Sequence, residues 1–204
     1  MRILYNLAMS PTTARAPKPR TAKKTLDRDA WLKKALDVLF ANGIAQVKIE
    51  VIARKLKLTK GSFYWHFRNR DDLLRSMVDW WRSNQLRFIS SLTHAHADPK
   101  AIIRAVIAFT QHTEDSHHDI AMREFARFNK QAAKAVTEVD QLRVSYLAEL
   151  FSTAGFDPVE SRLRARTLYF YQVGEYTTSL APELTEREDV AERLFRLLVS
   201  LPPG

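Results

Sequence analysis

Leu58-Thr59-Lys60-Gly61-Ser62-Phe63-Tyr64-Trp65-His66-Phe67 is a short segment with two kinds of side chain. Phe63 and Phe67 lie four residues apart, so on a helix they share one face and can be buried together. Thr59 can cap the helix, because its hydroxyl accepts hydrogen bonds from free backbone N–H groups. The remaining polar and amphipathic side chains point elsewhere: Lys60, Ser62, Tyr64, Trp65 and His66. A short helix that keeps aromatic rings and donors outside the core is predicted to contact a partner.

Two helix signals surround this segment and define its context. The first covers about residues 26–41 and ends at Asn42-Gly43, a typical C-terminal stop. Its apolar residues follow the i, i+3, i+4, i+7 spacing of an amphipathic helix: Leu32, Ala35, Leu36 and Leu39. The second begins near Lys48, and only two residues separate its last apolar position, Leu56, from Thr59. Two short helices joined by so tight a turn form a helix-turn-helix, whose second helix docks in DNA.

Several positions between about residues 28 and 75 match a known pattern together. They are Ile52-Ala53, Leu58–Phe67 and Arg70-Asp71-Asp72-Leu73-Leu74, with Ala35-Leu36, Phe40 and Gly43 upstream. This set resembles the DNA-binding signature of the TetR family of transcriptional regulators. Beyond it, only the helical pattern and the chain length agree with that family.

The resemblance implies a DNA-contacting surface on the second helix of the motif. Thr59, Lys60 and the helix N-terminus would hold phosphates, because free N–H groups and the helix dipole favour an anion. Gly61 would let the backbone approach DNA closely. For Tyr64 and His66 the alternative is packing between helices. The residues expected to contact DNA are Lys48, Thr59, Lys60, Gly61, Ser62, Tyr64, Trp65, His66 and Arg70, the last as a phosphate clamp.

Three positions depart from the pattern of that family. Lys57 stands where the family often has glycine in the turn, and a left-handed Lys would add strain of about 1 kcal/mol. Val47-Lys48 stands where the family often has a Ser or Thr cap, so Lys48 could supply the phosphate contact instead. Trp65 is large and can alter the base preference.

Charge is distributed unevenly along the chain, whose net charge is +9. Residues 1–24 carry six Lys/Arg and no acid, residues 25–82 carry twelve against seven, and residues 83–204 carry fourteen against sixteen. A basic first part beside a nearly neutral remainder indicates that one part meets a polyanion while the other has a different task.

The chain is predicted to divide into three segments. Residues 1–24 read as a disordered basic arm, either a solvated tail or a segment that enters a DNA minor groove. Their apolar start is too short for a transmembrane helix and too broken for a signal peptide, and either Met1 or Met9 can be the natural start. Residues 25–70 form the helix-turn-helix domain. Residues 71–204 form a helical domain for effector binding and dimerisation.

The fold class predicted from composition is all-α, with about nine helices. Only five glycines occur in 204 residues, and alternating β-branched runs are few. Helix starts are expected at Asn69–Asp72, at Asp98-Pro99, at His118 or Asp119, at Asp157-Pro158 and at the capping box Thr185–Glu188, with a helix end at Gly155.

The C-terminal domain is expected to bind a small molecule, as the resemblance implies. Its aromatic residues can line an apolar cavity, with a few polar side chains as anchors. Each is also compatible with plain core packing. The predicted effector-contacting residues are Phe109, His112, Phe125, Phe128, Tyr146, Tyr169, Gln172 and Glu175, and they favour an apolar or aromatic effector.

Residues 168–173 are apolar nearly all round the helix that contains them, so that helix must be covered on more than one side. One side can face its own core and the other a second subunit. The predicted dimer interface consists of Phe170, Val173, Gly174, Leu194, Leu197 and Leu198.

Other chemistries find little support in the sequence. His94-x-His96 and His117-His118 have spacings that do not place two imidazoles on one helical face, and the chain has no cysteine. No nucleophile elbow, dinucleotide fingerprint or metalloprotease motif is present. We therefore expect no metal, no cofactor and no enzymatic activity.

Together these patterns predict a cytoplasmic, homodimeric DNA-binding regulator, a repressor released from a near-palindromic operator on double-stranded DNA by a small effector. One alternative is a regulator without a ligand, or one controlled by a protein partner. A third possibility, a small-molecule carrier or enzyme, gains nothing from the basic N-terminal part. No membrane association is expected.

Overall fold

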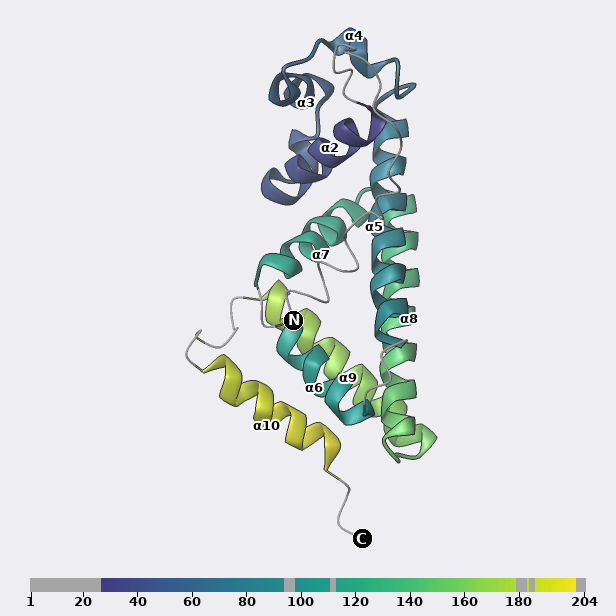
Figure 1. The fold of residues 1–204 in the computed structure, drawn as a ribbon, viewed down its shortest axis with the longest axis vertical. Coiled ribbons are helices and arrows are strands. Elements are labelled where there is room, and N and C mark those ends of the chain that lie inside the picture. Colours follow the sequence, from purple (N-terminus) through teal and green to yellow (C-terminus); the bar gives the residue numbers. More distant parts are fainter. Residues whose placement is uncertain (1–26, 94–97, 111–112, 179–182, 184–185, 201–204) are drawn as a thin grey trace, which may run out of the picture. The chain divides into compact units, whose positions relative to one another are not determined.

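The computed structural model describes residues 27–93, 98–110, 113–178, 183 and 186–200. Within these ranges the chain forms nine α-helices and one 3-10 turn, without a strand, which confirms the all-α prediction. The elements, labelled as in Figure 1, are α2 (Arg28–Asn42), η1 (Ile44–Gln46), α3 (Ile49–Leu56), α4 (Lys60–Phe63), α5 (Arg70–Thr93), α6 (Pro99–Thr110), α7 (Thr113–Ala126), α8 (Lys130–Thr153), α9 (Pro158–Thr177) and α10 (Arg187–Val199).

Local sequence explains most helix boundaries. Gly43 ends α2 with φ 75°, a left-handed value that glycine adopts at little cost. Asn69 caps α5, since its Oδ1 accepts from the backbone N–H of Asp72 over 2.9 Å. Asp157 caps α9 by accepting from the N–H groups of Val159 and Glu160, with Pro158 in the first turn. These predicted boundaries are confirmed.

Two other helix starts predicted from the sequence, those of α7 and α10, are not confirmed. Helix α7 begins at Thr113, so the start predicted at His118 or Asp119 is wrong; both residues lie inside the helix. The capping box of the last helix falls partly outside the described residues, and Glu186 at the N-cap makes no side-chain cap bond.

The chain divides into two compact units. The first comprises Met1–Asn84 with Ala121–Ala135, and the second comprises Gln85–Ile120 with Val136–Gly204. Helices α5, α7 and α8 each contribute residues to both units.

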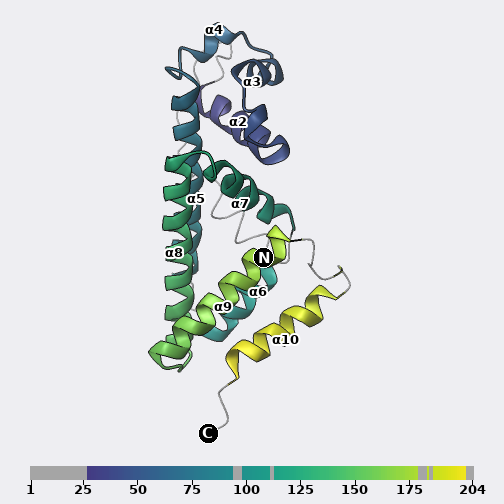
Figure 2. The ribbon, with the colours of Figure 1, turned by 180° about the vertical axis from the view of Figure 1, so that it is seen from behind.

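The first unit is built on the helix-turn-helix. Helix α2 packs against η1 and α3, and α3 packs against α4, as Figure 1 and Figure 2 show from opposite sides. Its core is a set of fully buried side chains from these helices and the first half of α5: Trp31, Leu39, Ile52, Phe63, Phe67, Leu73, Met77 and Trp81. Burial of each such side chain stabilises the fold by roughly 1.5–3 kcal/mol.

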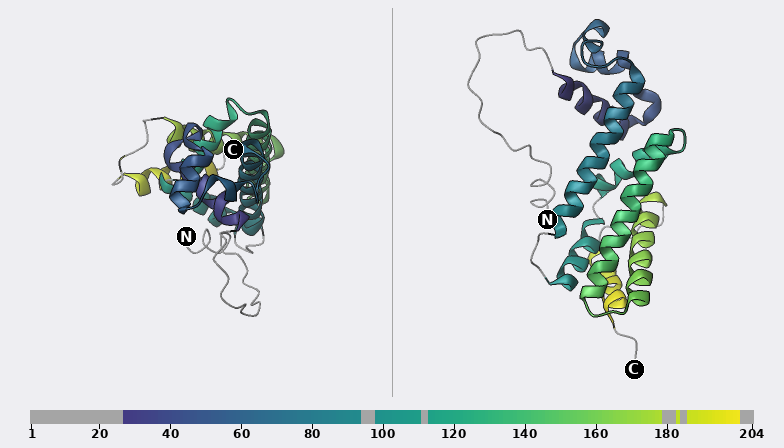
Figure 3. Two further views of the ribbon diagram at one scale, coloured as in Figure 1. Left: turned by 90° about the horizontal axis from the view of Figure 1, so that it is seen from above. Right: turned by 90° about the vertical axis from the view of Figure 1, so that its right-hand side faces the viewer.

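The second unit contains α6, α9, α10 and most of α8, which is one uninterrupted helix in the side view of Figure 3. Helix α6 packs against both α9 and α10. The core of the second unit includes Ile103, Ile107, Phe151 and Leu168, all nearly inaccessible to solvent. No helix in the described part of the chain is long and apolar enough to cross a bilayer.

Candidate nucleic-acid interface

Helix α4 is shorter than the sequence predicts. It covers only Lys60–Phe63, and Thr59 caps it by accepting a hydrogen bond from the N–H of Ser62 at 3.4 Å. The helix expected to continue to Phe67 instead tightens into a turn, because His66 and Phe67 both donate their N–H groups to the carbonyl of Phe63. The predicted cap is confirmed, whereas the predicted helix length is wrong.

The aromatic residues of this segment hold it to the core as predicted. Phe63 and Phe67 are buried, and their rings stack with centroids 5.3 Å apart. Trp31 of α2 meets Phe63 edge-on at 5.4 Å, and the guanidinium of Arg28 lies 4.7 Å from the centroid of Phe67. These contacts from α2 fix the orientation of α4.

The opposite face of the segment is exposed to solvent. Trp65 exposes 79% of its surface and Tyr64 57%, although the Tyr64 ring also meets Phe63 edge-on at 5.3 Å. Lys48, Thr59, Lys60 and Gly61 are exposed, while Ser62 and His66 are half-buried. The predicted DNA-contacting residues from Thr59 to His66 therefore lie on one short, solvent-facing segment. The Trp65 side chain is too exposed to serve as a core residue of this segment.

The turn between α3 and α4 is strained at one residue. Lys57 has φ 58° and ψ 41°, and it is the only residue other than glycine with positive φ in the described part of the chain. A side chain in this conformation costs roughly 1–2 kcal/mol. Position 57 therefore has the left-handed backbone conformation that glycine favours, as the family resemblance implies, although this chain has Lys there. Lys48, at the N-cap of α3, makes no side-chain cap bond.

Lys60 is engaged by a residue that the sequence patterns did not reveal. Its Nζ lies 2.5 Å from Oε1 of Glu50, which projects from α3. The hydrogen bond from Lys60 lowers the pKa of the Glu50 carboxyl. Glu50 is ten residues from Lys60, so no i, i+4 pattern could have predicted this pair.

Arg70, for which a phosphate contact is predicted, makes two hydrogen bonds within the protein. Its Nε donates to the backbone carbonyl of Val47 at 2.7 Å, and its Nη2 donates to that of Ile44 at 3.4 Å. The side chain is half-buried. Since two of its donor atoms serve backbone carbonyls near η1, Arg70 ties the start of α5 to the helix-turn-helix.

The residues predicted to bind an effector separate between the two units. Tyr146, Tyr169 and Gln172 are buried in the second unit, and Gln172 Nε2 donates to the carbonyl of Val106 at 3.2 Å. Burial, together with a hydrogen bond that Glu175 on the same helix accepts, raises the pKa of Tyr171 to about 12.

Of the other residues predicted to contact an effector, the two whose side chains the structure describes do not lie in the core of the second unit. Phe125 is buried in the first unit. Phe128, in the turn between α7 and α8, exposes 83% of its surface, so the prediction that it lines a cavity is corrected. The Phe109 side chain and His112 lie outside the described residues.

Polar groups inside the second unit form a network that the sequence did not reveal. Arg143 of α8 donates from Nη1 and Nη2 to the buried carboxylate of Asp119 on α7, at 2.5 and 3.2 Å. Its Nη2 also donates to Gln85 Oε1 at 2.7 Å, and the Tyr176 hydroxyl donates to Asp119 at 3.3 Å. Burial alone would lower the pKa of Arg143, but the Asp119 charge outweighs it and raises that pKa.

The residues predicted for dimerisation fall into two groups. Leu194 and Leu198 are buried in the core of their own protomer, and Val173 packs against it. Phe170 on α9 exposes 56% of its surface and Leu197 on α10 exposes 69%. A Cβ added at Gly174 would meet no atom within 4 Å.

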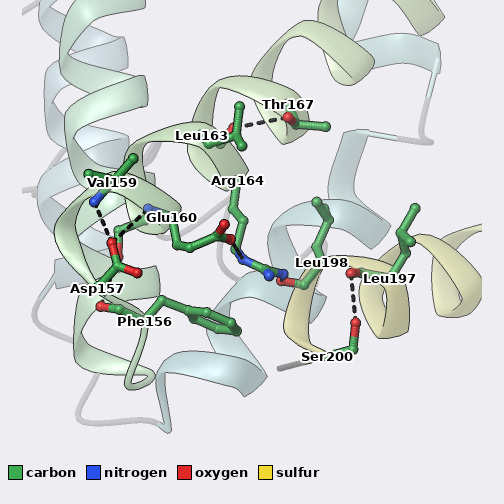
Figure 4. Close-up of polar contacts among 11 residues, drawn as sticks. Phe156, Asp157, Val159, Glu160, Leu163, Arg164, Thr167, Leu197, Leu198 and Ser200 are labelled. Atoms are coloured by element: carbon green, nitrogen blue, oxygen red, sulfur yellow. Dashed lines mark hydrogen bonds and ion pairs between the residues drawn. The ribbon is translucent and has the colours of Figure 1, made fainter. Parts of the chain in front are cut away.

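Arg164 links α9 to α10 (Figure 4). Its guanidinium donates to Glu160 Oε2 and to the Leu198 carbonyl, each at 2.8 Å. The same group lies 4.2 Å from the centroid of the Phe156 ring. This arrangement ties the end of α10 to the first half of α9.

No group of three or more His, Cys, Asp or Glu side chains in the described ranges is placed to hold a metal ion. His94 and His96 fall outside those ranges.

Comparison with known proteins points to one family. The model of "Bacterial regulatory proteins, tetR family" matches residues 32–77, which span α2 to the first part of α5. TtgW of Pseudomonas putida, an uncharacterized HTH-type transcriptional regulator, is 35% identical over 57 residues. That match covers 28% of this chain and 41% of the relative, so the chain aligns with less than half of the length of TtgW.

Solved structures share the fold over most of the chain. NemR of E. coli in its reduced form has a TM-score of 0.67 at 13% identity, covering 87% of this chain and 99% of that one. FadR of Bacillus subtilis, in complex with stearoyl-CoA, has a TM-score of 0.60 at 19% identity, covering 84% and 97%. At such identities the likeness shows the fold.

Proposed function

We propose that this chain, a member of the tetR family of bacterial regulatory proteins through residues 32–77, is a homodimeric repressor in the cytoplasm that leaves its operator when a small effector binds. The observation that carries the proposal is the α3–α4 motif, whose second helix is anchored by buried rings and presents exposed Lys60, Tyr64 and Trp65. Its proposed task is binding, not catalysis.

On DNA, the α4 segment divides into positioning and reading groups. Thr59 and Lys60 are proposed to contact phosphates, which fix the register without carrying sequence information. Gly61 is exposed, and a Cβ there would lie 3.7 Å from the Thr59 hydroxyl oxygen, so the protein itself has room for a Cβ atom at this position. The use we assign to this glycine is therefore close approach of the backbone to DNA.

Tyr64, Trp65 and His66 are proposed to read bases. An exposed indole can make apolar contact with a thymine methyl in the major groove. The sequence departure at Trp65 and its 79% exposure support a role in the preference of this protein for its operator.

A second copy of the chain is proposed to cover the exposed apolar residues of α9 and α10. Phe170 and Leu197 belong to this surface, together with Val159 and Leu163, which expose 66% and 58%. Arg164 supports it by tying α10 to α9. A symmetric dimer would present two helix-turn-helix units to half-sites about 34–36 Å apart.

The effector is proposed to bind in the second unit and to be largely apolar or aromatic. The Tyr146 hydroxyl is buried there, and no described residue offers it a hydrogen-bond partner. Buried polar groups are rarely left unsatisfied, so a ligand acceptor would complete this one. The solved FadR structure with stearoyl-CoA is a case in which a protein of this fold holds a small molecule with a long apolar part.

Two experiments test the proposal. Recovery of genomic fragments bound by the full chain should yield a shared near-palindromic sequence, and failure to enrich any sequence would contradict a repressor. A thermal-shift screen against apolar and aromatic metabolites should find a compound that raises Tm and weakens operator binding. A screen in which no compound does so would favour a regulator without a small-molecule effector.

A further inference from the structure

We propose that Glu50 restrains DNA binding by holding Lys60, so that the α3–α4 motif meets DNA with one cation fewer than its sequence implies. This inference rests on the proposed function, since it concerns the affinity of the same surface for DNA.

The geometry places the two charged groups at the predicted interface. Glu50 lies in the first turn of α3, and Lys60 is the first residue of α4. Their charged atoms are 2.5 Å apart, and both side chains remain more than half exposed. The Glu50 carboxylate therefore pairs with the Lys60 ammonium group while both groups stay accessible to solvent. Both groups would face a DNA backbone that contacts Thr59 and Lys60.

The Lys60 ammonium group keeps the Glu50 carboxyl in its charged form. The hydrogen bond from Lys60, with the coulombic attraction between the two groups, favours the charged carboxylate and lowers the pKa of Glu50. At neutral pH the pair carries no net charge. A phosphate that approaches Lys60 must compete with Glu50 and is repelled by it. The wild-type pair together therefore adds little net charge to the interface, and removal of Lys60 alone would leave the Glu50 carboxylate to repel DNA.

The magnitude follows from counterion release. Each cation added at a B-DNA interface steepens the slope of log K against log salt by about 0.9, which is roughly an eightfold gain in affinity at 0.1 M salt. Glu50→Gln keeps the shape of the side chain and removes its charge. It should therefore raise affinity about eightfold. Because a phosphate contact carries no sequence information, operator and non-operator DNA should gain alike.

The test measures this slope by fluorescence anisotropy for the wild type, E50Q, K60A and E50Q/K60A, on operator and on random duplex DNA. E50Q should steepen the slope by about 0.9, K60A should flatten it by a similar amount, and the double variant should return to the wild-type slope. Asp37→Asn is the matched control. It also removes an acid paired with a lysine, Lys34 at 2.7 Å, but on α2, and it should change the slope much less.

Several results would overturn the inference. E50Q could leave the slope unchanged, or E50Q/K60A could keep the whole gain of E50Q. Equal effects of E50Q and D37N would reduce the role of Glu50 to general charge, and a gain on operator alone would make Glu50 a base-reading residue. In each of these cases wild-type binding still supports the proposed function. Absence of salt-dependent DNA binding by the wild type would instead refute the proposed function itself.

Discussion

Arg70, the first residue of α5, donates a hydrogen bond from Nε to the backbone carbonyl of Val47 over 2.7 Å. Val47 is buried and lies between η1 and α3. The bond joins the helix that leaves the DNA-binding motif to the loop that begins it. A residue expected from sequence to clamp DNA is thus part of the frame of the motif.

Replacement of Arg70 distinguishes these two roles. R70K keeps the positive charge but loses the planar fork that reaches two carbonyls. We expect R70K to lower the free energy of unfolding by about 1–3 kcal/mol, measured by urea denaturation, and to leave the salt slope of DNA binding unchanged. R70M should destabilise the protein by a similar amount. If R70K were as stable as the wild type while R70M lost about one unit of salt slope, Arg70 would be a phosphate clamp after all.

Lys57→Gly should stabilise the protein, because glycine adopts φ 58° without the steric cost that Lys incurs. The expected gain is about 1 kcal/mol, visible as a higher Tm. Lys55→Gly is the matched control, since it removes the same charge two residues earlier inside α3. It should destabilise by up to about 1 kcal/mol. Changes of the same sign in both variants would show that charge, not backbone conformation, controls the response.

Phe170→Glu should dissociate the proposed dimer while the protomer stays folded, because Phe170 exposes 56% of its surface in the isolated chain. Sedimentation velocity should show a monomer, with far-UV circular dichroism unchanged. Phe128→Glu serves as the control: it introduces the same charge at another exposed phenylalanine and should leave the dimer intact. An F170E dimer as tight as the wild type would place the interface elsewhere.

Asp119→Asn should destabilise the second unit, because it leaves the Arg143 guanidinium, half-buried among four helices, without its carboxylate. Breaking a fully buried pair costs about 3–5 kcal/mol, and the partial exposure of Arg143 reduces the expected loss to about 2 kcal/mol. The double variant D119L/R143M should recover most of that loss, since matched apolar residues need no partner. A D119N protein with wild-type Tm would show that the pair contributes nothing to stability.

Local features of the motif were predictable from sequence because their causes are local. The Thr59 cap, the stop at Gly43 and the contact between the rings of Phe63 and Phe67 each depend on residues within four positions. The left-handed backbone at Lys57 followed from the family resemblance.

Features set by distant partners could not be predicted. The carbonyls that engage Arg70 lie 23 and 26 residues away, and Asp119 lies 24 residues from Arg143. Phe63 and Phe67, which flank the turn that follows α4, contact Trp31 and Arg28 of α2, more than 30 residues away in the sequence. Leu194, Leu197 and Leu198 were predicted together as interface residues, but sequence periodicity does not distinguish Leu194, which packs in the core of its own protomer, from Leu197, which is exposed.

The central claim is sequence-specific DNA binding by a dimer through the α3–α4 motif, and a footprint of the full chain on its recovered operator tests it most directly. We predict two protected half-sites about one helical turn apart, occupied by two protomers, with both footprints lost together in Phe170→Glu. Protection of a single half-site by a monomer, or binding no tighter than to random duplex DNA, would contradict it.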